Sequence, residues 1–242
     1  MIFTMFGRKR PSSLGTLFAG IVLAGVTAAS AAALSSQDPR DEQRAINAAD
    51  QQLARSLVIR PVDMPGWRAF SLYPKGGGGT GCPKFNPDLS DFTITGDQRG
   101  RQFARRNSKI DEVLSSTAAV YETEDDALGE WRIWTSPASV ACIRKMLQDS
   151  APAGSILSAS AKAAPLKLPR VAPLQFARRY VLVLLATGDI SAVYFDDIYL
   201  VRGRAAVSLI VQRVGEVGVP PTASVERRLV MLLGKRLEDT FP

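Results

Sequence analysis

The side chains that could do chemistry in this chain are its carboxylates and its two cysteines, because the sequence contains no histidine. The lack of histidine excludes serine-histidine-acid and cysteine-histidine catalysis, as well as histidine-ligated metals. The histidine-free acyl-transfer motif Ser-x-x-Lys does not occur in the sequence either. Two cysteines fall short of the four ligands of a usual zinc site. We therefore expect no metal, no cofactor and no catalytic residue.

The most conspicuous carboxylates are the adjacent Asp196 and Asp197, which lie in a segment with the pattern of a strand. Neighbouring side chains of a strand point to opposite faces, so these two cannot form a catalytic pair. One of them should face apolar neighbours and then requires an arginine partner. The candidates are Arg178, Arg179 and Arg213, and we expect a structural ion pair.

Several aromatic residues could line a ligand pocket, although side chains of this kind are more often part of the core. Together with the charged pair, the candidate ligand-lining residues are Trp67, Trp131, Tyr194, Tyr199, Asp196 and Arg179.

Residues 1–34 have the pattern of an export segment. The basic residues 8–10 precede an apolar run from Leu14 to Leu34. Small residues allow cleavage after Ala31 or Ala33, and the alternative is an uncleaved membrane anchor. In both cases the positive residues keep the N-terminus in the cytoplasm, so the rest of the chain is expected outside, secreted or anchored to the membrane.

If the chain is exported, we expect its two cysteines, Cys82 and Cys142, to form a disulfide. Cysteines in an oxidising compartment usually pair, and this bridge would close a loop of about 60 residues, worth about 4 kcal/mol in the chain-entropy model. If the chain is not exported, two free buried thiols are the alternative.

The net charge does not indicate a nucleic-acid partner. The chain carries 30 basic and 23 acidic residues, and three of the basic ones belong to the export segment. The others are scattered and accompany no aromatic-basic motif. Contact with a membrane is expected only through residues 14–34, if these are not cleaved.

Hydrophobic periodicity and turn residues predict an α+β fold, with an antiparallel sheet of about five to seven strands and helices packed mainly on one face. We expect one domain over residues 35–242, with a flexible connection at residues 150–173. The expected helices cover 41–57, 123–134 and 136–147, and a last helix begins at Thr222 or Ser224 and reaches Leu237. The expected strands cover 68–73, 92–95, 102–106, 109–121, 175–187, 192–202 and 205–212. The outer face of the last helix carries Glu226, Arg227, Arg228, Lys235 and Arg236.

Two segments carry a resemblance to a known family. The run Asp63-Met64-Pro65-Gly66-Trp67, and the run Ala119 to Ala127 followed by Trp131 and Cys142, resemble the actinobacterial extracytoplasmic sensor-domain family. That family includes the extracellular sensor domain of mycobacterial serine/threonine kinases and related envelope lipoproteins. The resemblance implies a binder of a small ligand or envelope component, without catalytic residues.

Three hypotheses follow for the function. The first is a non-enzymatic extracytoplasmic ligand-binding or sensor-like module of the bacterial cell envelope, which an apolar pocket would favour. The second is a structural or interaction protein that binds anionic polymer or lipid headgroups through the basic C-terminal helix, which a flat basic face would favour. The third, an enzyme, would require two carboxyl groups about 5 to 9 Å apart in one cleft.

Overall fold

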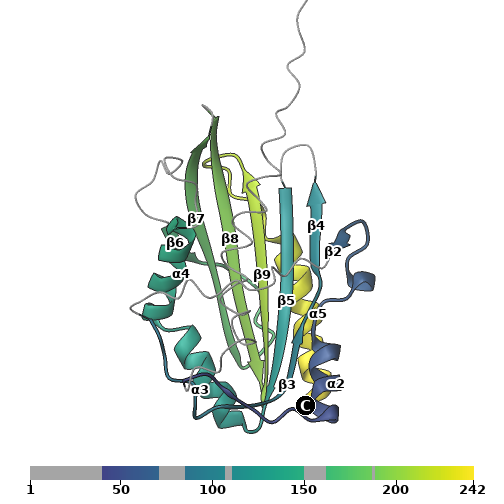
Figure 1. Ribbon diagram of the computed structural model, residues 1–242. Coiled ribbons are helices and arrows are strands. Elements are labelled where there is room, and N and C mark those ends of the chain that lie inside the picture. The colour runs from purple at the N-terminus through teal and green to yellow at the C-terminus, as the bar shows by residue number, and fades with distance from the viewer. Residues whose placement is uncertain (1–39, 71–84, 107–110, 150–161, 187–188) are drawn as a thin grey trace, which may run out of the picture.

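The computed structural model describes residues 40–70, 85–106, 111–149, 162–186 and 189–242 (Figure 1). Within this part of the chain, a nine-stranded sheet packs with four α-helices. The strands are β1 (Gln43–Arg44), β2 (Arg68–Phe70), β3 (Thr93–Arg99), β4 (Gln102–Arg106), β5 (Asp111–Tyr121), β6 (Lys162–Pro165), β7 (Leu174–Ala186), β8 (Asp189–Arg202) and β9 (Ala205–Gly215). The helices are α2 (Ala48–Leu57), α3 (Glu124–Trp134), α4 (Pro137–Asp149) and α5 (Ser224–Thr240), with a short 3₁₀ turn η2 (Pro61–Asp63).

The sheet is antiparallel except at one edge. Its order is β1-β3-β5-β9-β8-β7-β6, and only the short β1 pairs in parallel, with β3. Strands β3 and β4 follow each other along the same edge of β5, as the pairs Arg99 with Thr117 and Phe103 with Leu114 show. The expected number of strands was lower because β1, with two residues, is too short to have a pattern of its own and because β6 lies in the segment expected to be a flexible connection.

Strands β8 and β9 form the hairpin that the sequence predicts. Arg202 pairs with Ala205 across a two-residue loop, in which Gly203 has a φ of 54°. A positive φ at the first loop position suits the right-handed twist of the strands, and glycine adopts it without strain. The pairing continues from this loop to Ala192 and Gly215, and β8, with 14 residues, lies between β9 and β7 in the sheet.

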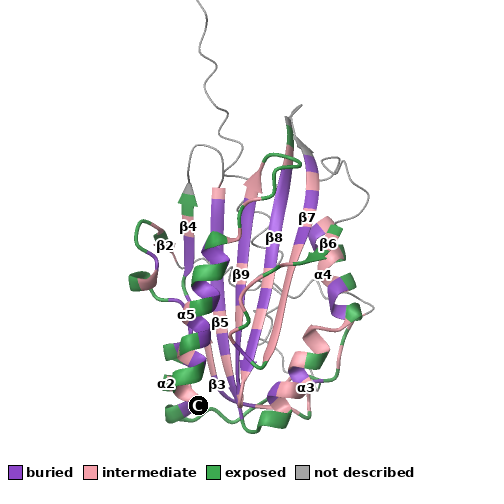
Figure 2. Cartoon of the chain, turned by 180° about the vertical axis from the view of Figure 1, so that it is seen from behind, coloured by how far each residue is buried: buried purple, intermediate pink, exposed green. Residues whose placement is uncertain are grey.

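Helices cover both faces of the sheet. Figure 2 shows α2 and α5 over one face, which we call the closed face, and Leu229 and Leu233 of α5 share a buried cluster with Val207 and Leu209 of β9 there. Helices α3 and α4 lie against the other face, where Val140 of α4 packs with residues of β7 and β8. The α+β class with an antiparallel sheet is confirmed, and within it the helices are divided between the two faces.

The starts of two helices follow local signals. The Thr123 side chain accepts a hydrogen bond from the Asp126 amide and caps α3, and Pro137 occupies the first position of α4. Both predictions are confirmed.

Helix α2 begins later than expected. Residues 43–47 run along β3, with backbone hydrogen bonds from Gln43, Ala45 and Asn47, and the Asn47 side chain caps the helix that starts at Ala48. Ile46 is therefore exposed, and the buried side of α2 carries Asp50, Ala54 and Leu57. The local apolar spacing was misleading because a long-range strand pairing determines the start of the helix.

A buried ionic cluster holds α5 against the closed face. The Arg213 side chain is 1% exposed and donates to Glu112 at 2.7 Å, to Asp196 at 3.3 Å and to Glu226. Arg179 donates to both oxygens of Asp196 at 2.6 Å. The structural ion pair expected for Asp196 is confirmed. The prediction that Glu226 lies on the outer face of its helix was wrong, because it is fully buried against Arg213.

Two expected segments fall partly or wholly outside the described residues. The export segment 1–34 lies outside them, and among the helices that are described none is long and apolar enough to cross a membrane. Of the expected connection, residues 150–161 also lie outside them, while residues 162–165 form the edge strand β6 and Val171 packs against Gly234 of α5.

Replacing Arg213 with methionine is expected to lower the free energy of unfolding by about 3 to 5 kcal/mol, because three buried carboxylates lose the guanidinium that they share. Urea unfolding of the full chain at pH 7.5, followed by circular dichroism, measures this change. Arg227→Met is the matched control, since Arg227 is exposed on α5, and it should change the stability by less than about 0.5 kcal/mol. Equal, small effects of the two substitutions would contradict a role for the cluster in stability.

Candidate functional site

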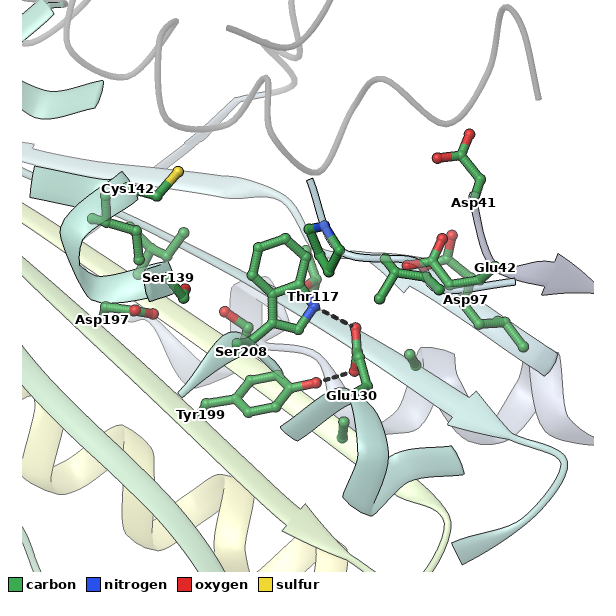
Figure 3. A pocket seen from close by; sticks show the side chains of 18 of the residues that line it. Asp41, Glu42, Asp97, Thr117, Glu130, Ser139, Cys142, Asp197, Tyr199 and Ser208 are labelled. Carbon is green, nitrogen blue, oxygen red and sulfur yellow. Dashed lines mark hydrogen bonds between the residues drawn. The ribbon is translucent and has the colours of Figure 1, made fainter. Parts of the chain in front are cut away.

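A cavity of about 410 Å³ lies on the sheet face that carries α3 and α4 (Figure 3). Residues of β3, β5, β8 and β9 form its floor, α3 and α4 form one side, and residues 40–44 and 85–89 form the other. The volume falls within the range of small-molecule sites. The lining residues on which the description below depends are Glu42, Asp97, Thr117, Glu130, Trp134, Ser139, Ile143, Phe176, Phe195, Asp197, Tyr199, Ser208 and Ile210.

The pairing of the strands determines which side chains lie in the middle of the cavity floor. Ser208 pairs with Thr117 of β5 on one side and with Tyr199 of β8 on the other. Side chains alternate along a strand, so Asp197 and Phe195 lie on the same face as Tyr199. The floor therefore presents hydroxyl, aromatic and carboxylate groups next to one another.

Glu130 of α3 is fixed by three hydrogen bonds. Its carboxylate accepts from the hydroxyls of Tyr121 and Tyr199, and from the Trp134 indole nitrogen at 3.0 Å. Burial raises the pKa of Glu130, and the three donors oppose this shift. The network fixes the orientations of Tyr199 and Trp134, and these two side chains border the cavity (Figure 3).

Asp197 differs from Glu130, because none of the described residues donates a hydrogen bond to its carboxylate or forms an ion pair with it. Burial raises its pKa to about 6, and the positive charge of Arg178, its cross-strand neighbour, only partly offsets this effect. Ser139 of α4 lines the same cavity and is 0% exposed, and its hydroxyl has no hydrogen-bond partner among the described residues. In Figure 3, Ser139 and Asp197 lie toward the same end of the cavity.

The other end of the cavity is also acidic. Glu42 and Asp97 lie there, and Asp97 pairs with Arg44 at 3.0 Å. Burial raises the pKa of Glu42. In total, the described lining has five carboxylates and three guanidinium groups, so negative charge predominates in the cavity.

Of the six residues singled out from the sequence as ligand-lining, Tyr199 lines this cavity. Asp196, Arg179 and Tyr194 lie together on the closed face, where the Arg179 guanidinium is 5.8 Å from the ring of Tyr194. The other two are also elsewhere. Trp67 packs beside the closed-face core under Arg105, and Trp131 packs against the buried cluster that contains Tyr121.

Cys142 lies on α4 and lines the cavity, and no free cysteine is present among the described residues. Its expected partner Cys82 lies outside them. The bridge between the two residues stays a prediction.

Sequence reasoning did not single out Asp197, Ser139 and Glu130 for this face. The alternation of side chains along the strand puts the two aspartates on opposite faces of the sheet, but only the packing of α4 shows that Asp197 faces a cavity. Glu130 lies seven residues after its helix cap, and no local signal pairs it with the tyrosines of β5 and β8.

The cavity offers no evident metal centre, since among the described residues no group of three or more Cys, Asp and Glu side chains could hold a metal ion. Comparisons with protein-family models, with curated proteins and with solved structures found no match to this chain.

Replacing Asp197 with asparagine is expected to stabilise the protein at pH 7.5 by about 1 to 3 kcal/mol, because a partly buried charge without a partner among the described residues is removed. Between about pH 4 and 6 the folded state holds a proton on Asp197 that the unfolded state has released, so the contribution of Asp197 to the stability of the wild type falls as the pH rises. The gain from Asp197→Asn should therefore appear above about pH 6 and fade toward pH 4.

Urea unfolding at several pH values measures this dependence. Asp196→Asn is the matched comparison, since the same substitution one residue earlier removes the acceptor of Arg179 and Arg213 and should destabilise the protein. A loss of stability for Asp197→Asn at pH 7.5 would mean that a partner already neutralises this carboxylate.

Proposed function

We propose that this protein is a non-enzymatic, extracytoplasmic ligand-binding or sensor-like module of the bacterial cell envelope, and that the cavity beside α3 and α4 is its binding site. The observation that carries the proposal is the cavity itself, a space of about 410 Å³ whose lining combines apolar and aromatic side chains with charged and hydroxyl groups. This combination is typical of small-molecule sites. The expected export segment, residues 1–34, supports the location outside the cytoplasm.

The rigidity of the lining supports a binding role. Glu130 fixes Tyr199 and Trp134, and the floor is a sheet whose strands β8 and β9 pair over eleven registered positions. Side chains that are held in place before a ligand arrives lose little entropy when it binds.

The alternative is an interaction protein that binds anionic polymer or lipid headgroups through α5. The basic side chains of this helix are mostly engaged within the fold. Arg236 pairs with Asp63 at 2.8 Å, Arg228 donates to the Asp63 carbonyl, and Lys235 pairs with Asp239 at 2.8 Å. These contacts neutralise much of the positive face that such binding requires, so the ligand-binding function has the stronger support.

An enzyme with paired carboxylates has less support. Glu130 and Asp197 both line the cavity, but Glu130 already accepts three hydrogen bonds, which leaves it poorly placed to exchange a proton with a substrate.

Filling the cavity tests the proposal. Ser208→Phe places a phenyl ring on the middle of the floor, and it should weaken binding of small aromatic fragments by about tenfold or more while the protein stays folded. The probe is a set of neutral, cationic and anionic indole and phenyl fragments, titrated into the full chain and followed by heteronuclear NMR.

Thr222→Phe is the matched control, because it makes the same kind of change at an exposed position before α5. It should bind the fragments with the affinity of the wild type. If no fragment binds, or if Ser208→Phe binds as well as the control does, the cavity is not a ligand site.

A further inference from the structure

One end of the cavity has two hydrogen-bonding groups that the fold does not use. Among the described residues, the Asp197 carboxylate accepts no hydrogen bond, and the Ser139 hydroxyl, in a residue that is 0% exposed, has no partner. Buried polar groups are usually satisfied within a protein, so an unused pair that lines a cavity indicates a ligand that supplies the missing partner. A hydroxyl and a carboxylate together form a site for a hydrogen-bond donor.

The Asp197 carboxylate has no ion-pair partner among the described residues, and this favours a cationic donor at this end of the cavity. The nearest charged or titratable groups are Arg178 and Tyr180 of β7 and, beyond Tyr180, Arg144 of α4. Arg178 approaches the ring of Phe176, at 5.3 Å, and forms no ion pair with Asp197 among the described contacts. Asp197 thus keeps a negative charge that a ligand can neutralise, and the excess of carboxylates in the lining adds to the attraction.

Apolar side chains surround the same carboxylate. Phe195 and Tyr199 lie two residues to either side of Asp197 on the same face, and Ile210 is its cross-strand neighbour on β9. On α4, Ile143 lies one turn after Ser139 and also lines the cavity. An aromatic wall beside a carboxylate binds an amine well, because the ring faces attract the cation and pack against its hydrocarbon.

We propose that the ligand of this cavity carries a protonated amine on an apolar, ring-containing body. The ammonium group donates to the Asp197 carboxylate and the Ser139 hydroxyl, and the body packs against Phe176, Phe195 and Ile210. This inference rests on the proposed function, because it names the ligand class of the same site.

The test compares three probes with the same indole body and different head groups. Tryptamine is cationic, tryptophol is neutral and indole-3-propionate is anionic at pH 7.5. Affinities for the full chain are measured by isothermal titration calorimetry. Tryptamine should bind about tenfold more tightly than tryptophol, because a hydrogen bond to a charged group is stronger than a neutral one. The propionate should bind most weakly.

Substitutions test whether Asp197 and Ser139 cause the preference for tryptamine. Asp197→Asn should reduce the affinity for tryptamine about tenfold, to the level of tryptophol, and leave tryptophol binding within about twofold. Ser139→Ala should weaken tryptamine binding by a smaller factor. Glu238→Gln, which removes one exposed negative charge from α5, is the control for net charge and should change nothing. The preference for tryptamine should also shrink as the pH falls below about 6, where Asp197 takes up a proton.

The outcomes separate this inference from the proposed function. If the three probes bind equally well, or if Asp197→Asn leaves the preference for tryptamine unchanged, the amine assignment is wrong while the cavity remains a ligand site. If the propionate binds best, the ligand is an anion. If none of the probes binds, both the amine assignment and the proposed function are overturned.

Discussion

The buried guanidinium of Arg213 is the interaction on which the closed face of the sheet depends. It lies between Glu112 of β5, Asp196 of β8 and Glu226 of α5, and so connects two strands and a helix that are distant in the sequence. Arg179 and Arg105 supply the further positive charges that three buried carboxylates require. Such a cluster is weak evidence of stability by itself, because burying the ions opposes their attraction. Its consequence is geometric, since the ion pair between Arg213 and Glu226 requires α5 to lie against this part of the sheet.

The two faces of the sheet use adjacent residues of one strand in opposite ways. Asp196 points to the closed face, where arginines pair with it, whereas Asp197 points to the other face, where no described residue donates to it. The closed face is filled by α2 and α5, so its charges serve the fold. The opposite face is covered less completely by α3 and α4, and this difference leaves room for the cavity.

The features that were predicted correctly from the sequence are those whose signals are local. The cap at Thr123, the proline at the start of α4 and the tight turn at Gly203 each act within a few residues, and the structure has all three. The start of α2 was missed because it depends on the pairing of β1 with β3, about 50 residues away in the chain. The candidate site was missed for the same reason. The alternation of β8 separates Asp196 from Asp197, but which face is filled and which is hollow depends on how the helices pack.

The free-energy cost of an Asp197 without a partner among the described residues is better explained by a role in ligand binding than by a role in folding. A partly buried carboxylate with a raised pKa, to which no described residue donates a hydrogen bond, destabilises the folded state at neutral pH, and a protein gains nothing for its fold by keeping it. Local features that oppose stability concentrate at functional sites, where a ligand supplies the missing interactions. Glu130, which also lines the cavity, differs from Asp197, because its carboxylate accepts three hydrogen bonds and holds the aromatic lining in place. Glu130 thus shapes the cavity, and Asp197 remains available to bind a ligand.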